Sequence, residues 1–276
     1  MGRTGGASGG DRHHRPLANA LVVSVHTQEL MPKSTRRRRT TRFVLWSTLL
    51  IGLPLGALAL VWLITLPDVA RLATSNPTST ALMESRFARA KEEGHVVSRQ
   101  WVWVPLSRVS PHLLRAVITA EDASFFIHEG FDWEGIKDAA LHNLEAGDMK
   151  RGGSTITQQL AKNLYLSSER SLFRKAREAL ITRLLEHRLT KERILELYIN
   201  VAEWGRGVYG AEAAARRHFG KSAADLSADE AAWLAAILPS PQRYDPIRKT
   251  AALTRRHHRI LRWMDRVPTA IHRRIP

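Results

Sequence analysis

The stretch SPHLLRAVITAEDASFFIHEGFDW, residues 110–133, contains the signals that decide the class of fold. Ser110 is a favourable N-cap residue, and Pro111 suits the first helical position because its missing N–H needs no partner there. Apolar side chains follow at helical spacing, at Leu113, Leu114, Val117 and Ile118. The stretch therefore predicts a buried helix that leads into two adjacent carboxylates, Glu121 and Asp122.

Helical patterns recur along most of the chain that follows. They occupy residues 172–189, 191–200, 210–219, 227–238 and about 248–265. Ser227 and Glu230 have the spacing of a capping box, which marks the start of one of these helices. The segment QWVWVPL, residues 100–106, alternates Trp and Val before a proline, which suits a short strand. We therefore expect a mainly α domain over residues 81–276.

A membrane helix is predicted before this domain. Residues 43–66, FVLWSTLLIGLPLGALALVWLITL, contain no charged side chain and are long enough to cross a bilayer, which takes roughly 20 helical residues. Basic residues cluster directly before them, at Lys33, Arg36, Arg37, Arg38, Arg39 and Arg42. Positive charge of this kind favours the cytoplasmic side. The expected order is a disordered basic N-terminus (1–42), a transmembrane helix (43–66), a linker (67–80) and an extracytoplasmic domain.

Composition narrows the classes of partner. The chain has 42 Lys and Arg against 26 Asp and Glu, a net charge of +16, so an anionic partner is expected: nucleic acid, phospholipid or a phosphorylated substrate. There are no cysteines, which excludes disulfides, thiolate metal sites and cysteine nucleophiles.

The first candidate site lies at the end of the opening stretch. If the helix continues past Ile118, then Glu121, Phe125 and His128 share one face. A carboxylate beside aromatic rings loses hydration, so its pKa rises towards the range useful for proton transfer. The alternative is that Glu121 and Asp122 are solvated residues at a helix end and His128 is an ordinary histidine.

The second candidate site is GGSTITQQLAKNLYL, residues 152–166. Ser154, Gln158 and Lys162 are spaced by four and form a polar stripe on a predicted helix. A helix that begins after two glycines exposes free N–H groups, which suits an anion such as phosphate. The alternative is that Thr155 and Gln158 form a capping box on a surface helix.

The third candidate site combines cations with one carboxylate. Arg170, Arg174 and Glu178 lie four residues apart, and Lys175 flanks them. This pattern suits a cationic clamp for a diphosphate. The alternative is ordinary surface pairing of Arg174 with Glu178, worth a few tenths of a kcal/mol.

Together these segments resemble the peptidoglycan glycosyltransferases, which polymerise lipid II, and most closely the monofunctional biosynthetic members. The resemblance is carried, in the family's order, by EDASFFIHEGFD (121–132), GGSTITQQLAKNLYL (152–166), RKAREALITRLLE (174–186), RILELYIN (193–200) and GAEAAARRHFGK (210–221). It implies a mainly helical, lysozyme-like lobe with a smaller membrane-facing lobe. It also implies a single-pass protein of the bacterial cytoplasmic membrane with its N-terminus in the cytoplasm.

The resemblance implies a role for each candidate residue. Glu121 would be the general base that deprotonates the 4-hydroxyl of the acceptor sugar, which attacks with inversion, and Glu178 would be the second carboxylate. Cations would neutralise the undecaprenyl diphosphate leaving group, at Lys162, Arg170 and Lys175. Polar side chains would bind donor sugar or phosphate, at Ser154, Gln158 and Gln159. The supporting residues would be Asp122, Phe125 and His128.

The resemblance also bears on cofactors and partners. No protein metal site is expected, although a divalent cation, Mg²⁺ or Mn²⁺, would suit the diphosphate. The expected partners are lipid II, the nascent glycan, membrane lipids and cell-wall synthesis or division proteins, with no nucleic acid. The basic segment 255–266 would contact anionic lipid, or else form a solvated helix face.

Transpeptidase chemistry is not expected, because no S-x-x-K motif occurs and Lys249-Thr250-Ala251 is not K-T-G. Two rival functions fit parts of the sequence. A lysozyme-like glycan-cleaving enzyme also uses paired carboxylates in a helical lobe. A membrane-tethered basic binding protein would explain the charge alone.

Overall fold

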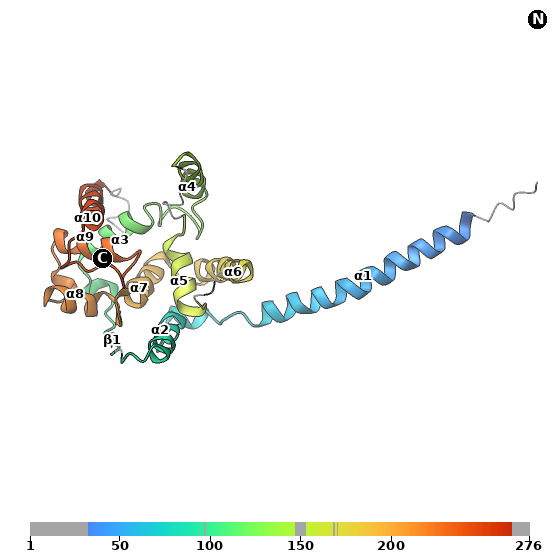
Figure 1. Cartoon of the computed structure of the whole chain (residues 1–276), viewed down its shortest axis with the longest axis horizontal. Helices are drawn as coiled ribbons and strands as arrows, with labels where there is room; N and C mark the ends of the chain where they lie inside the picture. The colour runs from blue at the N-terminus through green and yellow to red at the C-terminus, as the bar shows by residue number, and fades with distance from the viewer. Residues whose placement is uncertain (1–32, 97, 147–152, 168, 170, 267–276) are drawn as a thin grey trace, which may run out of the picture. The chain divides into compact units, whose positions relative to one another are not determined.

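Helices dominate the part of the chain that the structure, a computed structural model, describes (Figure 1). The described residues are 33–96, 98–146, 153–167, 169 and 171–266. The chain divides into two units, residues 1–64 and 65–276. The prediction of a mainly α protein is confirmed.

The described part of the first unit is one long helix, α1 (Lys33–Ile64). Its part Trp46–Ile64 is long and apolar enough to cross a membrane. The helix begins at Lys33, inside the basic segment that was expected to be disordered, and residues 1–32 lie outside the described part. Pro54 lies within α1, which membrane helices tolerate.

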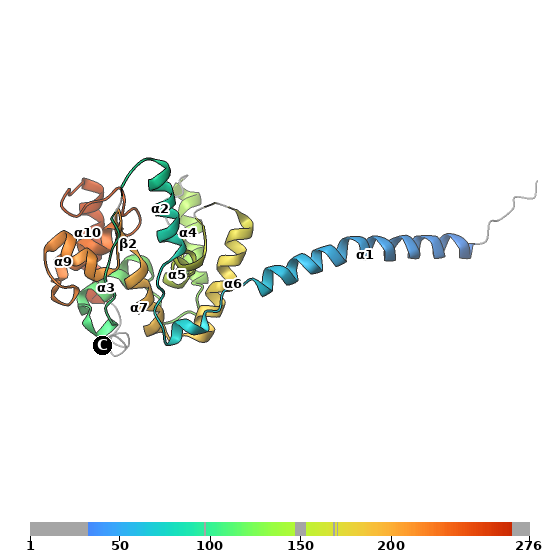
Figure 2. The same ribbon diagram turned by 90° about the horizontal axis from the view of Figure 1, so that it is seen from below.

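Figure 2 shows the second unit turned by 90° from the view of Figure 1. Its first half comprises η1 (Ala70–Ala73), α2 (Ala81–Glu92), β1 (Gln100–Trp101), η2 (Leu106–Arg108), α3 (Pro111–Glu121), α4 (Trp133–Ala146) and α5 (Ile156–Tyr165). Its second half comprises α6 (Leu172–Arg188), α7 (Lys191–Val201), β2 (Glu203–Gly205), β3 (Val208–Tyr209), α8 (Ala211–Phe219), η3 (Ala223–Asp225), α9 (Ala228–Ile237), α10 (Ala251–Trp263) and η4 (Met264–Arg266).

The starts of the predicted helices agree with their capping residues. The hydroxyl of Ser110 accepts the N–H of His112 at the start of α3, and Ser227 and Glu230 form the predicted capping box of α9. The predicted strand is shorter than expected, because β1 ends at Trp101 and pairs in parallel with β3. β2 pairs with β3 in the antiparallel direction.

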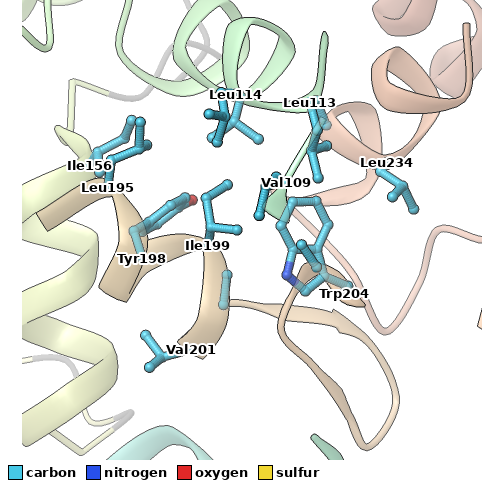
Figure 3. Packing of buried hydrophobic residues seen from close by; sticks show 14 of the residues in the cluster. Val109, Leu113, Leu114, Ile156, Leu195, Tyr198, Ile199, Val201, Trp204 and Leu234 are labelled. Atoms are coloured by element: carbon cyan, nitrogen blue, oxygen red, sulfur yellow. The ribbon is translucent and has the colours of Figure 1, made fainter. Parts of the chain in front are cut away.

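α7 forms the centre of the hydrophobic core (Figure 3). Leu195, Tyr198 and Ile199 of this helix are buried, and they lie among Leu113 and Leu114 of α3, Ile156 of α5, Trp204 of β2 and Leu234 of α9. α5 packs against α2, α6 and α7, whereas α3 packs against α9 and α10. The core therefore fixes the end of α3 relative to α5 and α10, which carry the site described below.

A buried amide ties the segment after β1 to α7. The Asn200 side chain accepts the N–H of Val104 at 2.9 Å and donates to the carbonyls of Val104 and Glu196, each at 2.8 Å. Asn200 is fully buried, so these backbone groups depend on its amide.

Replacing this amide is expected to destabilise the fold. Asn200→Ala should lower the free energy of unfolding by about 2–4 kcal/mol, because it leaves a cavity and buried backbone groups without partners. Urea unfolding in detergent, followed by circular dichroism, measures the change. The matched variant Asn76→Ala removes a surface hydrogen bond to Arg193 and should cost about 0.5 kcal/mol or less. An equal loss of unfolding free energy in the two variants would contradict this stabilising role of the Asn200 amide.

Candidate active site

Glu121 is the last residue of α3, and its side chain is only 10% exposed. One carboxylate oxygen accepts a hydrogen bond from the Gln159 amide at 2.8 Å, and the other accepts one from the Arg256 guanidinium at 2.8 Å. The Tyr198 hydroxyl donates to the amide oxygen of Gln159 at 3.0 Å, which turns the NH₂ group towards Glu121. The carboxylate is therefore held from α5 and α10 at once.

Burial raises the pKa of Glu121 above its ordinary value of 4.5. The positive charge of Arg256 and the hydrogen bond from Gln159 act in the opposite direction without cancelling the effect of burial. A carboxylate of this kind accepts a proton more readily than a solvated one. The raised pKa agrees with the prediction from sequence, and the solvated alternative for Glu121 is wrong.

The expected continuous helical face is wrong, because α3 does not continue past Glu121. Asp122 has φ −164° and ends the helix, so Glu121, Phe125 and His128 do not share a helical face. Phe125 is fully buried in the core, with the Lys191 amine 4.5 Å from the centre of its ring. Asp122, the first residue after α3, bonds through its carboxylate to groups outside the helix.

Asp122 joins the end of α3 to the start of α5. Its carboxylate accepts the backbone N–H of Ile156 at 2.9 Å and the Nε2–H of His128 at 2.9 Å. Nδ1 of His128 accepts the N–H of Gly130 at 3.0 Å, which assigns the proton to Nε2. Asp122 and His128 are thus bracing residues, and neither is a solvated side chain.

The start of α5 differs from the predicted phosphate site. Asp122 takes the N–H of Ile156, and Thr155 and Gln158 form the capping box that the sequence allowed. Gln158 is buried in that box, so the predicted polar stripe with Ser154 and Lys162 is wrong. The box belongs to a buried helix, because α2, α6 and α7 surround α5.

A cationic cluster, formed by Lys162 of α5 and by Arg174 and Lys175 of α6, surrounds Glu178. Glu178 of α6 is 3% exposed and accepts hydrogen bonds from Arg174, at 2.7 Å, and from Lys175. The alternative pairing of Arg174 with Glu178 is therefore confirmed, but the pair is not an ordinary surface pair, because the Glu178 side chain is buried. The charge of Lys162, on α5, acts on both Glu178 and Glu121. Arg170 lies outside the described residues.

The environment of Lys162 weakens its hold on a proton. Although the side chain is exposed as a whole, loss of water around its amine lowers the pKa. Glu178 opposes this shift, and the positive charges of Arg174 and Lys175 add to it. An arriving diphosphate would restore the charge, because a nearby negative group raises the pKa of an amine.

The cationic cluster does not fit a metal ion held by Glu178. Both oxygens of this carboxylate already face cations, Arg174 and Lys175. Within the described part of the chain, no group of three or more His, Asp or Glu side chains gathers to hold a metal.

A cavity of about 490 Å³ opens beside Glu121. Its walls come from the end of α3, the start of α4, residues 153–155 and α10, and they include Ser154. Lys162, Lys175 and Glu178 lie outside these walls. The structure therefore divides the predicted residues between a cavity with Glu121 and a cationic cluster, and α5 joins the two through Gln159 and Lys162.

Arg256 was not predicted as a site residue. The sequence placed it in a basic segment expected to contact lipid, since its charge pattern does not distinguish it from its neighbours. Its partner Glu121 is 135 residues away in the chain. Only the packing of α10 against α3 brings the two together.

The chain is similar in sequence to known proteins over most of its length. Residues 88–265 match the family model described as "Transglycosylase". A protein of Bordetella pertussis named "Biosynthetic peptidoglycan transglycosylase" is 45% identical over 241 residues, which cover 86% of this chain and 99% of the relative.

Relatives of the same name show similar agreement. The protein of Laribacter hongkongensis is 50% identical over 191 residues, 69% of this chain and 84% of the relative. That of Nitrosospira multiformis is 49% identical over 186 residues, 67% of this chain and 81% of the relative. The chain therefore belongs to the transglycosylase family, as the resemblance of its sequence blocks predicted.

Proposed function

We propose that the chain is a peptidoglycan glycosyltransferase that polymerises lipid II into glycan strands. The observation that carries this proposal is a buried carboxylate of raised pKa, Glu121, joined by one helix to a cationic cluster. The first suits a base, and the second suits a diphosphate leaving group. The names of the relatives support the same activity.

The proposed reaction is an inverting transfer. Glu121 removes the proton from the 4-hydroxyl of the acceptor GlcNAc, and that oxygen attacks the anomeric carbon of the growing chain. The bond from this carbon to the diphosphate oxygen breaks, and its electron pair leaves with undecaprenyl diphosphate. Lys162 and Lys175 stabilise the negative charge that develops there, and Arg170 would join them as the resemblance implies.

The hydrogen-bond partners of Glu121 influence the ionisation and the orientation of its carboxylate before the reaction. Arg256 and Gln159 hydrogen-bond to the ionised carboxylate, which favours the form that accepts a proton. Burial acts against ionisation and makes the carboxylate more basic. Tyr198 fixes the amide of Gln159. Glu121 is thereby oriented by two groups and still able to take the hydroxyl proton.

The proposed location is the cytoplasmic membrane. α1 has a span suited to a bilayer, and the basic residues at its start support a cytoplasmic N-terminus under the positive-inside rule. The catalytic unit would then act on lipid II at the outer face. Membrane lipids and cell-wall synthesis or division proteins remain predicted partners, and so does a divalent cation bound to the diphosphate itself.

The glycan-cleaving alternative explains fewer of the observations. Hydrolysis of a neutral glycosidic bond produces no diphosphate, so it gives no role to Lys162, Arg174 and Lys175 around Glu178. A basic binding protein gives no role to the raised pKa of Glu121. Polymerisation uses both features.

Removal of the proposed base should abolish polymerisation. Glu121→Gln should lower the rate about 10³-fold or more, within the range lost when a catalytic group is removed. Labelled lipid II and separation of the products by length provide the assay. Glu129→Gln, a change at an exposed glutamate paired with Arg183, is the matched control and should retain activity. Shortening of preformed glycan without polymerisation would instead support the cleaving enzyme.

The Arg256 contact should be visible in the pH dependence of the rate. A base works only when ionised, so kcat/KM falls as pH drops through the pKa of Glu121. Arg256 lowers that pKa, so Arg256→Ala should move the acid limb of the profile to higher pH. The exposed neighbour Arg255, changed to Ala, should leave the limb in place. If Arg256→Ala moved the acid limb to lower pH, Arg256 would not be the group that lowers the pKa of Glu121.

Loss of the Lys162 charge should slow the departure of the diphosphate. Lys162→Met should lower kcat about 10²-fold, the usual effect of removing one stabilising group from a developing anion. Lys162→Arg should recover part of the rate because it restores the charge. Lys137→Met, at an exposed position of α4, serves as the control. Unchanged kcat in Lys162→Met would exclude a role for this amine.

A further inference from the structure

His257 is a buried histidine that follows Arg256 directly on α10. Its side chain is only 4% exposed, whereas the nearby Arg255 and His258 are exposed. Burial lowers the pKa of His257 below its ordinary value of 6.5, and the charge of Asp229 opposes this shift. The ring is therefore uncharged at neutral pH, so it lies beside Arg256 without repelling its charge.

Two residues of α9 hold this ring. The imidazole of His257 stacks on the indole of Trp233, with the ring centres 3.9 Å apart and the planes 11° apart. Its Nε2 atom lies 2.9 Å from the carboxylate of Asp229. Asp229 and Trp233 are four residues apart and therefore lie on one face of α9. The stack sets the plane of the imidazole and Asp229 sets its direction within that plane, so α9 fixes how α10 is turned at this point.

Trp233 also contacts the chain just before α10 begins. The amine of Lys249 lies 4.8 Å from the centre of the Trp233 ring. The next residue, Thr250, caps α10 by accepting the N–H of Leu253 at 3.3 Å. The start of α10 and the turn that carries His257 thus contact the same side chain of α9, which restrains both the position and the rotation of the helix.

The hydrogen bond between Arg256 and Glu121 depends on that rotation. Consecutive residues of a helix point about 100° apart, so with His257 against α9, Arg256 points towards the end of α3. Its guanidinium donates to the Glu121 carboxylate at 2.8 Å and lies 3.4 Å from the carbonyl of Ala120. A displacement of about 1 Å would take the first contact beyond hydrogen-bond distance.

We propose that His257, held by Trp233 and Asp229, is a positioning residue that directs Arg256 onto Glu121. His257 is not among the residues that line the cavity beside Glu121, so it acts through Arg256. An aliphatic side chain at this position would fill the space but would offer neither the flat stack nor the polar contact at the ring edge. The inference rests on the proposed function, because it concerns the orientation of the proposed base.

The ionisation midpoint of Glu121 tests the proposal without substrate. The full-length protein, labelled with ¹³C in its glutamate carboxyl groups, is titrated in detergent. Arg256 lowers the pKa of Glu121, so His257→Ala should raise the midpoint as Arg256→Ala does, and by at least half as much. His257→Phe keeps a flat ring on the indole and should restore most of the change. His258→Ala, at the exposed neighbour, should leave the midpoint where it is.

A double-mutant cycle separates positioning from a direct effect of charge. If His257 acts through Arg256, His257→Ala should cause no further change in a protein that already carries Arg256→Ala. A direct effect of imidazole charge on Glu121 would persist in that background. The proposal is wrong if His257→Ala leaves the midpoint unchanged, or if its effect adds fully to that of Arg256→Ala.

Asp229→Ala tests the sign of the effect at an exposed position, and it decides the question if His257→Ala does not fold. Loss of a carboxylate charge would by itself lower the pKa of Glu121, because like charges raise one another's pKa. A loosened Arg256 would raise it instead. The proposal predicts a rise in the midpoint, and a midpoint at or below that of the unchanged protein would overturn it.

A general loss of stability should not produce the same result. Glu212→Ala removes a buried carboxylate of α8 that accepts the N–H of Ala223 at 2.8 Å. This variant should lower the melting temperature, measured by circular dichroism, without moving the midpoint of Glu121. An equal rise of the midpoint in Glu212→Ala and His257→Ala would show that His257 has a structural role only.

Polymerisation of lipid II provides the second readout. The acid limb of kcat/KM should lie at higher pH in His257→Ala than in the unchanged enzyme, because more Glu121 is protonated at a given pH. If the midpoint moves as predicted but the unchanged chain does not polymerise lipid II, the positioning role stands and the proposed function fails. If the chain polymerises lipid II but the midpoint does not move in the variants, the proposed function stands and the positioning role fails.

Discussion

The hydrogen bond from the N–H of Ile156 to the Asp122 carboxylate is the contact on which the site depends. It ends α3 and caps α5 with the same side chain. Glu121 precedes Asp122 directly, so fixing one fixes the other, and Gln159 and Lys162 follow from the start of α5. One short contact thus sets the position of the proposed base relative to both its amide partner and the cationic cluster.

Two opposing effects act on the ionisation of Glu121. Burial makes the carboxylate more basic, yet a base must be ionised before it can act. Arg256 and Gln159 supply enough stabilisation to orient the ionised form, and the pKa still lies above its ordinary value. Glu178 has the opposite arrangement, because Arg174 and Lys175 engage both of its oxygens. The two buried carboxylates are therefore suited to different roles.

Local sequence signals predicted the helices more accurately than the contacts between them. The caps at Ser110 and Ser227 define helix starts through neighbouring residues, so the sequence could reveal them. α2 and α4 were not predicted, and the helix through Glu121 was extended too far, because Asp122 bonds to a residue 34 positions away. Arg256 was missed for the same reason: its role depends on packing between α10 and α3.

The central claim is that Glu121 is a buried carboxylate of raised pKa that ionises before it acts as the base. NMR titration of the protein labelled with ¹³C in its glutamate carboxyl groups measures this directly, and the signal that disappears in Glu121→Gln identifies the residue. The account predicts an ionisation midpoint above 4.5, the ordinary value for this side chain. A midpoint at or below that value would show a solvated or strongly paired carboxylate and would contradict the account.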